Sequence, residues 1–143
     1  LFQKMTEGFK NLISVVASKV ITNERIIIPP NYGHILINLG FDVLVTANWD
    51  ADNFKSNYEP VKERQGMAYY VIKNSQGSFD FVKNSNYNNH PEVKIISESE
   101  KVQAGFGFKP SEPMYTAGMK NPKLLEFLNT PEKYLDRLSS LVS

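Results

Sequence analysis

Two histidines are the side chains of this sequence best suited to metal or acid–base chemistry, because the chain contains no cysteine. His34 follows a double proline and a turn and begins an alternating apolar stretch, whereas His90 precedes Pro91 in an asparagine-rich loop. A single imidazole binds a divalent ion weakly, and useful sites employ three or four ligands. A lone histidine in a strand is therefore more often a core or surface residue than a ligand, and we expect His90 to be exposed in its loop.

Two tyrosines and a group of cations could recognise a sugar phosphate. Tyr32 and Tyr58 each offer a hydrogen-bond donor, an acceptor and an apolar face, although structural packing explains them equally well. The side chains of Lys55, Lys62 and Arg64 could neutralise a phosphate, but a charged loop is more commonly just solvated. The sequence contains no glycine-rich phosphate loop, no nucleophile elbow and no Ser-His-Asp arrangement.

Short β-strands are expected to position these residues over the first two thirds of the chain. Runs rich in Val, Ile and aromatic residues, separated by turn residues, predict strands at residues 12–21, 25–28, 34–38, 42–48, 67–72, 78–82 and 93–96. Alternation places His34, Leu36 and Asn38 on one face of their strand. Trp49 ends the 42–48 strand, where a core position is favoured over stacking on a sugar ring. Many short strands at this spacing predict a sandwich or a jelly-roll barrel.

The last third of the chain changes character. Residues 97–111 are polar and contain glycine, which predicts a loop or linker. The pairs Asn121-Pro122 and Thr130-Pro131 each place a capping residue before a proline suited to the first helical position. We therefore expect two short amphipathic helices packed on the outside of the sheet, with partner binding as the less favoured role. The predicted division is a β-barrel part at residues 1–97 and a linker with two helices at residues 98–143.

Composition restricts the class of protein. A chain of 143 residues with 41% hydrophobic and 12% aromatic residues predicts a single globular domain. A net charge of +1 gives no reason to expect nucleic acid or an anionic membrane as partner. No apolar run approaches the ~20 residues that span a bilayer. The lack of cysteine fits a reducing compartment, and we expect a cytoplasmic location.

The segment around His34 resembles the second motif of cupin barrels. That motif reads Gly, five residues, Pro, one residue, Gly, two residues, His, three residues and Asn, and Pro29, His34 and Asn38 lie in register with it. Asn23 and Asn31 occupy the two glycine positions, and Asn replaces Gly at positive φ more readily than other residues do. The resemblance implies that His34 is a metal ligand that points into a barrel.

The first cupin motif, which supplies two His and one Glu ligand, has no counterpart in residues 1–22. We therefore expect the chain to be the C-terminal part of a longer polypeptide. The expected fold is all-β, a cupin or jelly-roll barrel that lacks its first strands and carries a short C-terminal helical tail. Such a barrel exposes unpaired strand edges and apolar surface, which predicts a homodimer or a strand-swapped oligomer.

Residues 26–72 resemble the cupin-type glucose-6-phosphate isomerases of archaea and some bacteria. The similarity lies in the run from Ile28 to His34, in Asn38, and in residues 43–49, 58–66 and 68–72. Residues 113–115 and 122–134 are also similar to the tail of longer bacterial members. The resemblance implies the interconversion of glucose 6-phosphate and fructose 6-phosphate. It also implies one divalent metal ion, iron, nickel, manganese or zinc, held by three His and one Glu.

Only part of the family's site maps onto this chain. His34 corresponds to one metal ligand, and Tyr32 falls where the family has aromatic residues in the turn. Tyr58 matches a tyrosine that follows a second active-site histidine in archaeal members, but residues 55–57 contain no histidine. The general base is not identified, since Glu59 and Glu63 lie on an expected surface helix.

Two alternatives to an isomerase remain open. The chain could be a non-catalytic, cupin-like sugar-binding or structural module, or its missing strands could come from another polypeptide that completes the site in trans. The resemblance predicts a sugar phosphate as partner and one divalent metal in the intact protein. By itself, this chain is expected not to build the complete four-ligand site and to show negligible turnover.

Overall fold

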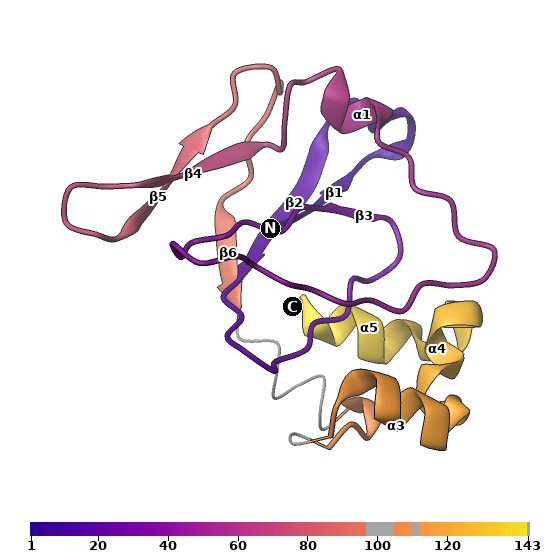
Figure 1. The fold of residues 1–143 in the computed structure, drawn as a ribbon. Coiled ribbons are helices and arrows are strands. Elements are labelled where there is room, and N and C mark those ends of the chain that lie inside the picture. The colour runs from indigo at the N-terminus through magenta and orange to yellow at the C-terminus, as the bar shows by residue number, and fades with distance from the viewer. Residues whose placement is uncertain (97–104, 110–111, 143) are drawn as a thin grey trace. The chain divides into compact units, whose positions relative to one another are not determined.

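The computed structural model describes residues 1–96, 105–109 and 112–142 (Figure 1). Strands dominate the first two thirds of the chain, and short helices occupy its C-terminal part, which confirms the predicted order of elements. The chain divides into two compact units. Unit 1 contains Leu1–Ala17, Asn31–Val45 and Ser56–Ile95, and unit 2 contains Ser18–Pro30, Thr46–Lys55 and Ile96–Ser143. The described strands form two open sheets and no closed barrel, so the jelly roll stays a prediction.

A four-stranded sheet contains the strand that ends at His34. Its order is β3 (Tyr32–His34), β1 (Phe2–Met5), β2 (Leu12–Ser18) and β6 (Val93–Ile96). Strand β1 pairs antiparallel with both neighbours, so that Phe2 lies opposite Val16 on one side and His34 on the other. The link from β1 to β2 contains the 3-10 turn η1 (Glu7–Phe9), where Gly8 takes a φ of 73° that suits glycine.

The second sheet is a two-stranded antiparallel hairpin. It contains β4 (Tyr69–Lys73) and β5 (Phe79–Lys83), paired with Val71 opposite Phe81. The side-chain oxygen of Asn74 accepts the backbone N–H groups of Gln76 and Ser78 at 3.1 and 2.9 Å and thereby closes the hairpin turn. This local hydrogen bonding is the turn chemistry that asparagine favours.

Buried apolar residues join these strands inside unit 1. The core cluster contains Leu12, Val15, Ala68, Tyr69 and Tyr87. Tyr69 stands edge-on to Phe81 with ring centroids 6.5 Å apart, which extends the cluster onto β5. The hairpin is thereby anchored to this core through Tyr69 of β4.

Two buried amide side chains cross-link unit 1. Asn84 is 1% exposed and donates to the carbonyl oxygens of Arg64 and Met67 at 2.9 and 3.0 Å. Gln3 is also 1% exposed; it accepts the N–H of Ala68 at 2.8 Å and donates to the Tyr87 hydroxyl at 2.9 Å. Buried polar groups need such partners because an unpaired one is costly.

Unit 2 contains the C-terminal helices. They are α3 (Met114–Lys120), η2 (Pro122–Leu125), α4 (Glu126–Asn129), η3 (Pro131–Tyr134) and α5 (Leu135–Leu141). Both predicted helix starts are confirmed, since η2 begins at Pro122 and η3 at Pro131. Neither Asn121 nor Thr130 makes the expected side-chain cap, however. The proline, with its fixed φ and missing N–H, therefore sets each start.

The core of unit 2 is aromatic and aliphatic. Its buried residues are Ile27, Phe106, Phe108, Ala117, Phe127, Leu138 and Leu141. Phe106 and Phe127 meet edge-on at 4.7 Å between ring centroids. The helices are thus held by a packed core, and the sequence did not predict the contribution of Ile27. No helix of the described residues has the length and hydrophobicity needed to cross a membrane.

Three predicted strands differ from the structure. Residues 25–28 and 42–48 form no strand, and the strand predicted at 34–38 ends at His34. Near residue 25 the backbone is fixed by side-chain packing instead, because Ile27 enters the core of unit 2 and the Arg25 guanidinium donates to the carbonyl of Lys109 at 3.0 Å. A strand also requires a neighbour to pair with, which composition does not reveal. Most of the loop predicted at 97–111 lies outside the described residues.

Candidate functional site

His34 lies at the end of the edge strand β3 in unit 1. The residue is exposed, whereas Phe2, directly opposite on β1, is 1% exposed. The enclosed position that the cupin resemblance implies is therefore not formed by unit 1 itself. The role of His34 as a metal ligand stays a prediction.

Tyr32 shares β3 with His34 and has a more defined environment. It is half-buried, and its hydroxyl lies 3.3 Å from the Ser14 hydroxyl on β2. The ammonium group of Lys4, which is paired with Tyr32 across the sheet, lies 5.8 Å from the centre of its ring. A phenol beside a cation can contact a sugar hydroxyl or a phosphate, but these partners also hold it in the sheet.

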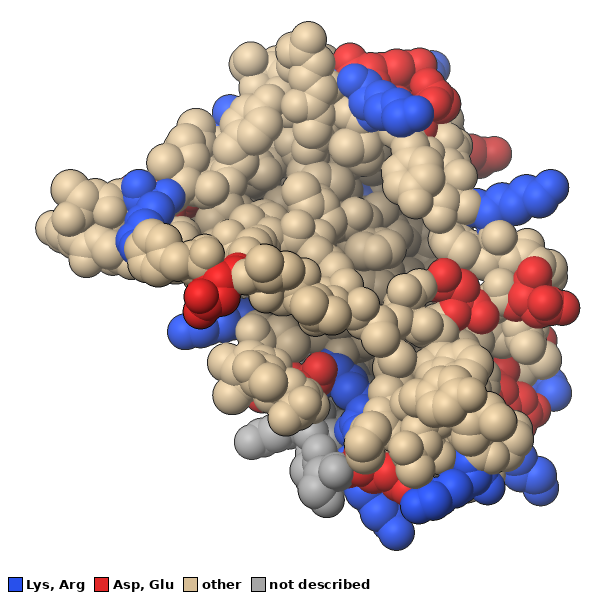
Figure 2. All heavy atoms as spheres, in the orientation of Figure 1, with Lys and Arg blue, Asp and Glu red and all other residues tan. Residues whose placement is uncertain are grey.

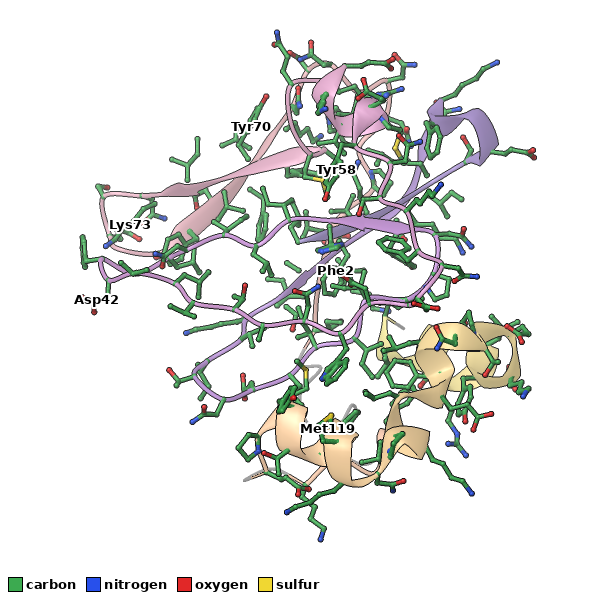
Figure 3. The ribbon with its side chains drawn as sticks, turned by 45° about the vertical axis from the view of Figure 1, so that its right-hand side comes forward. Phe2, Asp42, Tyr58, Tyr70, Lys73 and Met119 are labelled. Atoms are coloured by element: carbon green, nitrogen blue, oxygen red, sulfur yellow. The ribbon has the colours of Figure 1, made fainter. Side chains whose placement is uncertain are left out.

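Tyr58 comes from a different element, the helix α1 (Glu59–Lys62) that it precedes (Figure 3). Its side chain is exposed, with 64% of the residue accessible to solvent. Its carbonyl oxygen accepts the N–H groups of Val61 and Lys62 at 3.2 and 3.0 Å. The backbone of Tyr58 therefore starts the helix, and its phenol is left available to a ligand.

Arg64 was a candidate for phosphate contact, and its observed partners are structural. Its guanidinium donates to the carbonyl oxygens of Pro60, at 2.8 Å, and of Phe9. It also lies 5.3 Å from the centre of the Tyr87 ring. Lys62 pairs with Glu59 at 3.2 Å on the exposed face of α1, where such a pair adds little stability. These contacts give Arg64 a structural role, which neither phosphate contact nor simple solvation describes.

The metal prediction can be compared with the described residues. Within residues 1–96, 105–109 and 112–142, no three His, Asp or Glu side chains are grouped so that they could hold a metal ion. The residues that the structure describes therefore do not form a complete metal centre by themselves.

His90 differs from its prediction as an exposed residue. It is half-buried, with its Nε2 atom 2.8 Å from the carbonyl oxygen of Asn84. Its ring stands edge-on to Tyr69 at 5.6 Å between centroids. His90 therefore fixes the loop after β5 against the core of unit 1. Its neighbour Pro91 accepts the Tyr69 hydroxyl at 2.8 Å and strengthens this contact.

Trp49 is half-buried and packs against helix α3, outside the two core clusters. In unit 2 its ring stacks on Tyr115, with centroids 5.8 Å apart and an angle of 12° between the planes. A Cβ atom added at Gly118 would lie 3.4 Å from the Trp49 ring, so the helix backbone approaches the indole closely. The tight contact at Gly118 is with Leu125, since the same Cβ atom would lie only 2.7 Å from Cδ1 of the Leu125 side chain.

The backbone before His34 has the conformation expected where Asn23 and Asn31 take the two glycine positions of the cupin motif. Asn23 and Asn31 have φ values of 67° and 66°, the left-handed region that favours glycine. Asn38 shapes the following turn, since its amide donates to the carbonyl of Asp42 at 2.7 Å and accepts the N–H of Gly40 at 3.0 Å. The expectation that asparagine replaces glycine at positive φ is confirmed at both positions.

Substitution of Asn31 provides a test of this backbone requirement. Asn31→Ala should lower the free energy of unfolding by about 1 kcal/mol relative to Asn31→Gly, because a Cβ atom is disfavoured at this φ. Urea denaturation of both variants measures the difference. Ser85→Ala, a substitution at an exposed loop position of unit 1, serves as the control. Equal stability of the two Asn31 variants would contradict the assigned conformation.

Comparison with known proteins identifies the family. A family model described as Glucose-6-phosphate isomerase (GPI) matches residues 1–92. No curated protein and no solved structure matches the chain. The matched region covers well over half of the 143 residues and contains Tyr32, His34 and Tyr58. The chain therefore belongs to the glucose-6-phosphate isomerase family.

Proposed function

We propose that the protein acts as an aldose–ketose isomerase that interconverts glucose 6-phosphate and fructose 6-phosphate. The observation that carries this proposal is the family match over residues 1–92. The cupin-type subclass is part of the proposal. It is supported by the spacing of Pro29, His34 and Asn38 and by the positive φ values of Asn23 and Asn31.

The chemistry requires a proton or hydride to move between two neighbouring carbons of the sugar. A group must polarise the carbonyl and hydroxyl oxygens, and a base with a pKa near neutrality must accept the proton. When bound, a divalent metal ion (iron, nickel, manganese or zinc) would supply this polarisation. His34 is the residue of this chain that is proposed to hold it.

In the proposed enzyme, the residues of this chain bind the sugar phosphate. Tyr32 and Tyr58 are the proposed contacts to the sugar hydroxyls or the phosphate, since both carry a phenol on unit 1. The exposed side chain of Tyr58 can reorient toward a ligand, whereas Tyr32 is held between Lys4 and Ser14. A cytoplasmic location belongs to the same proposal and is supported by the absence of cysteine.

A coupled assay that follows glucose 6-phosphate formation from fructose 6-phosphate tests the proposal. We expect turnover by the product of the complete gene and negligible turnover by residues 1–143 alone. Chelation followed by addition of single metals tests the metal requirement separately. A complete gene product that binds fructose 6-phosphate in calorimetry without converting it would refute the isomerase and indicate a sugar-binding module instead.

A further inference from the structure

One face of the four-stranded sheet carries a row of three polar side chains from three different strands. Lys4 of β1 lies directly opposite Ser14 of β2 on one side and Tyr32 of β3 on the other. Directly opposite residues of antiparallel strands point to the same face, so the three side chains lie together. All three are half-buried. The other face of β1 contains Gln3, whose side chain contacts the core of unit 1.

The row brings two hydroxyl groups and a cation close together. The Tyr32 side chain reaches across β1, so that its hydroxyl lies 3.3 Å from the Ser14 hydroxyl. The Lys4 ammonium group lies 5.8 Å from the centre of the Tyr32 ring. The mutual hydrogen bond of the two hydroxyls uses only one of their protons, so the other can be donated to a ligand. The ammonium group adds three N–H donors.

The charge of Lys4 is not neutralised by a neighbouring carboxylate. Within the part of the chain that the structure describes, Lys4 takes part in no ion pair. Figure 1 places β3 in the middle of unit 1, and Figure 2 shows few acidic side chains over that part. In the neighbouring row of the same face, Phe2 and Val16 are each 1% exposed. A charge-assisted hydrogen bond is stronger beside such an apolar surface than in open water.

We propose that Lys4, Ser14 and Tyr32 bind the phosphate group of a sugar phosphate. Phosphate oxygens accept hydrogen bonds and carry negative charge, and the row offers N–H and O–H donors beside a cation. Lys4 supplies the charge, and the two hydroxyls fix the direction of approach. The identity of the sugar rests on the proposed isomerase, whereas phosphate binding by the row does not.

The position of the row relative to His34 suits this substrate. His34 lies two residues beyond Tyr32 on β3 and directly opposite Phe2. It therefore belongs to the next row on the same face, about 7 Å farther along the strand. In the proposed enzyme, the reacting carbons C1 and C2 lie near His34, and the phosphate is attached to C6. An open six-carbon chain is long enough to reach from one row to the other.

An NMR titration of this chain with inorganic phosphate tests the site without reference to catalysis. At constant ionic strength, phosphate should shift the backbone amide signals of Lys4, Ser14 and Tyr32, whereas chloride should not. Lys4→Met removes the charge at a similar side-chain length and should raise the phosphate dissociation constant about tenfold or more. Lys4→Arg keeps a phosphate-binding cation and should stay within a few-fold of the parent.

Two further variants keep the titration decisive. Lys83→Met is the matched control, because Lys83 is an exposed lysine of β5 in the other sheet, and its phosphate affinity should equal that of the parent. Ser14→Ala removes one hydroxyl and should raise the dissociation constant about threefold, even if Lys4→Met were to disturb the sheet. Equal effects of Lys4→Met and Lys83→Met would indicate an adventitious ion only and would overturn the proposal.

Kinetics of the complete gene product separate this inference from the proposed function. Lys4→Met should raise the KM for fructose 6-phosphate about tenfold and change kcat little, because the phosphate is remote from the reacting carbons. An active enzyme whose KM is unchanged by Lys4→Met would refute the phosphate site and leave the isomerase standing. An inactive gene product that still shows phosphate shifts dependent on Lys4 would refute the isomerase and support the site.

Discussion

Replacement of Asn84 with alanine is expected to lower the free energy of unfolding by about 3 kcal/mol. The Asn84 amide is buried and donates to the carbonyl oxygens of Arg64 and Met67, while its oxygen accepts the N–H of Asn86 at 3.0 Å. Alanine removes all three hydrogen bonds and leaves a buried carbonyl without its donor. It also leaves a cavity that the surroundings fill only in part.

Asn86 provides a matched control for this substitution. Its side-chain amide donates to the same Arg64 carbonyl, at 3.1 Å, but Asn86 is exposed. Water can replace its hydrogen bond, so Asn86→Ala should cost about 0.5 kcal/mol or less. Urea denaturation with a fixed m-value compares the two variants. If Asn86→Ala destabilised the protein as much as Asn84→Ala, burial could not be the cause of the larger effect.

Local backbone chemistry was predictable from the sequence. The positive φ values at Asn23 and Asn31 and the helix starts at Pro122 and Pro131 follow from the conformational preferences of single residues. These preferences act over a few residues, so no tertiary partner needs to be known. Helix α3 was missed because it follows Pro113 without a side-chain cap, which left no clear start signal.

Strands that depend on distant partners were predicted less well. Residues 67–72, 78–82 and 93–96 lie close to the observed β4, β5 and β6. Residues 42–48 have an equally strong strand composition but form none. Composition indicates that a segment suits a sheet, whereas only the rest of the fold decides whether an edge is present to pair with it.

The candidate site was likewise predicted only in part. Tyr32 was expected in the turn before a strand that begins at His34, whereas β3 contains both residues and ends at His34. The structural roles of Arg64 and His90 were not predicted, because the carbonyl groups that they contact become neighbours only on folding. Arg64 reaches the carbonyl of Phe9 across 55 positions of the sequence. An arginine that donates to main-chain carbonyls has no local sequence signal that separates it from a phosphate-binding arginine.

Replacement of Gln3 with leucine is expected to lower the free energy of unfolding by about 2–3 kcal/mol. Leucine fills a similar volume but leaves the buried N–H of Ala68 without its acceptor and the Tyr87 hydroxyl without its donor. Burial raises the pKa of Tyr87, so its neutral phenol is the form present in the folded protein at neutral pH. The pKa of Tyr87 is higher in the folded protein than its value of about 10 in the unfolded chain. The stability contributed by the neutral phenol is therefore complete below about pH 10 and is lost as the pH rises through the folded pKa.

A double-mutant cycle at neutral pH separates the Gln3–Tyr87 hydrogen bond from the rest of the network. Tyr87→Phe removes the hydroxyl, which also donates to the carbonyl of Gly66 at 2.9 Å, and should cost about 1–2 kcal/mol. In the double variant, neither side chain leaves the other without a partner. Its cost should therefore fall short of the sum of the single costs by about 1 kcal/mol. Additive costs would show that the two side chains stabilise unit 1 separately, Gln3 through Ala68 and Tyr87 through Gly66.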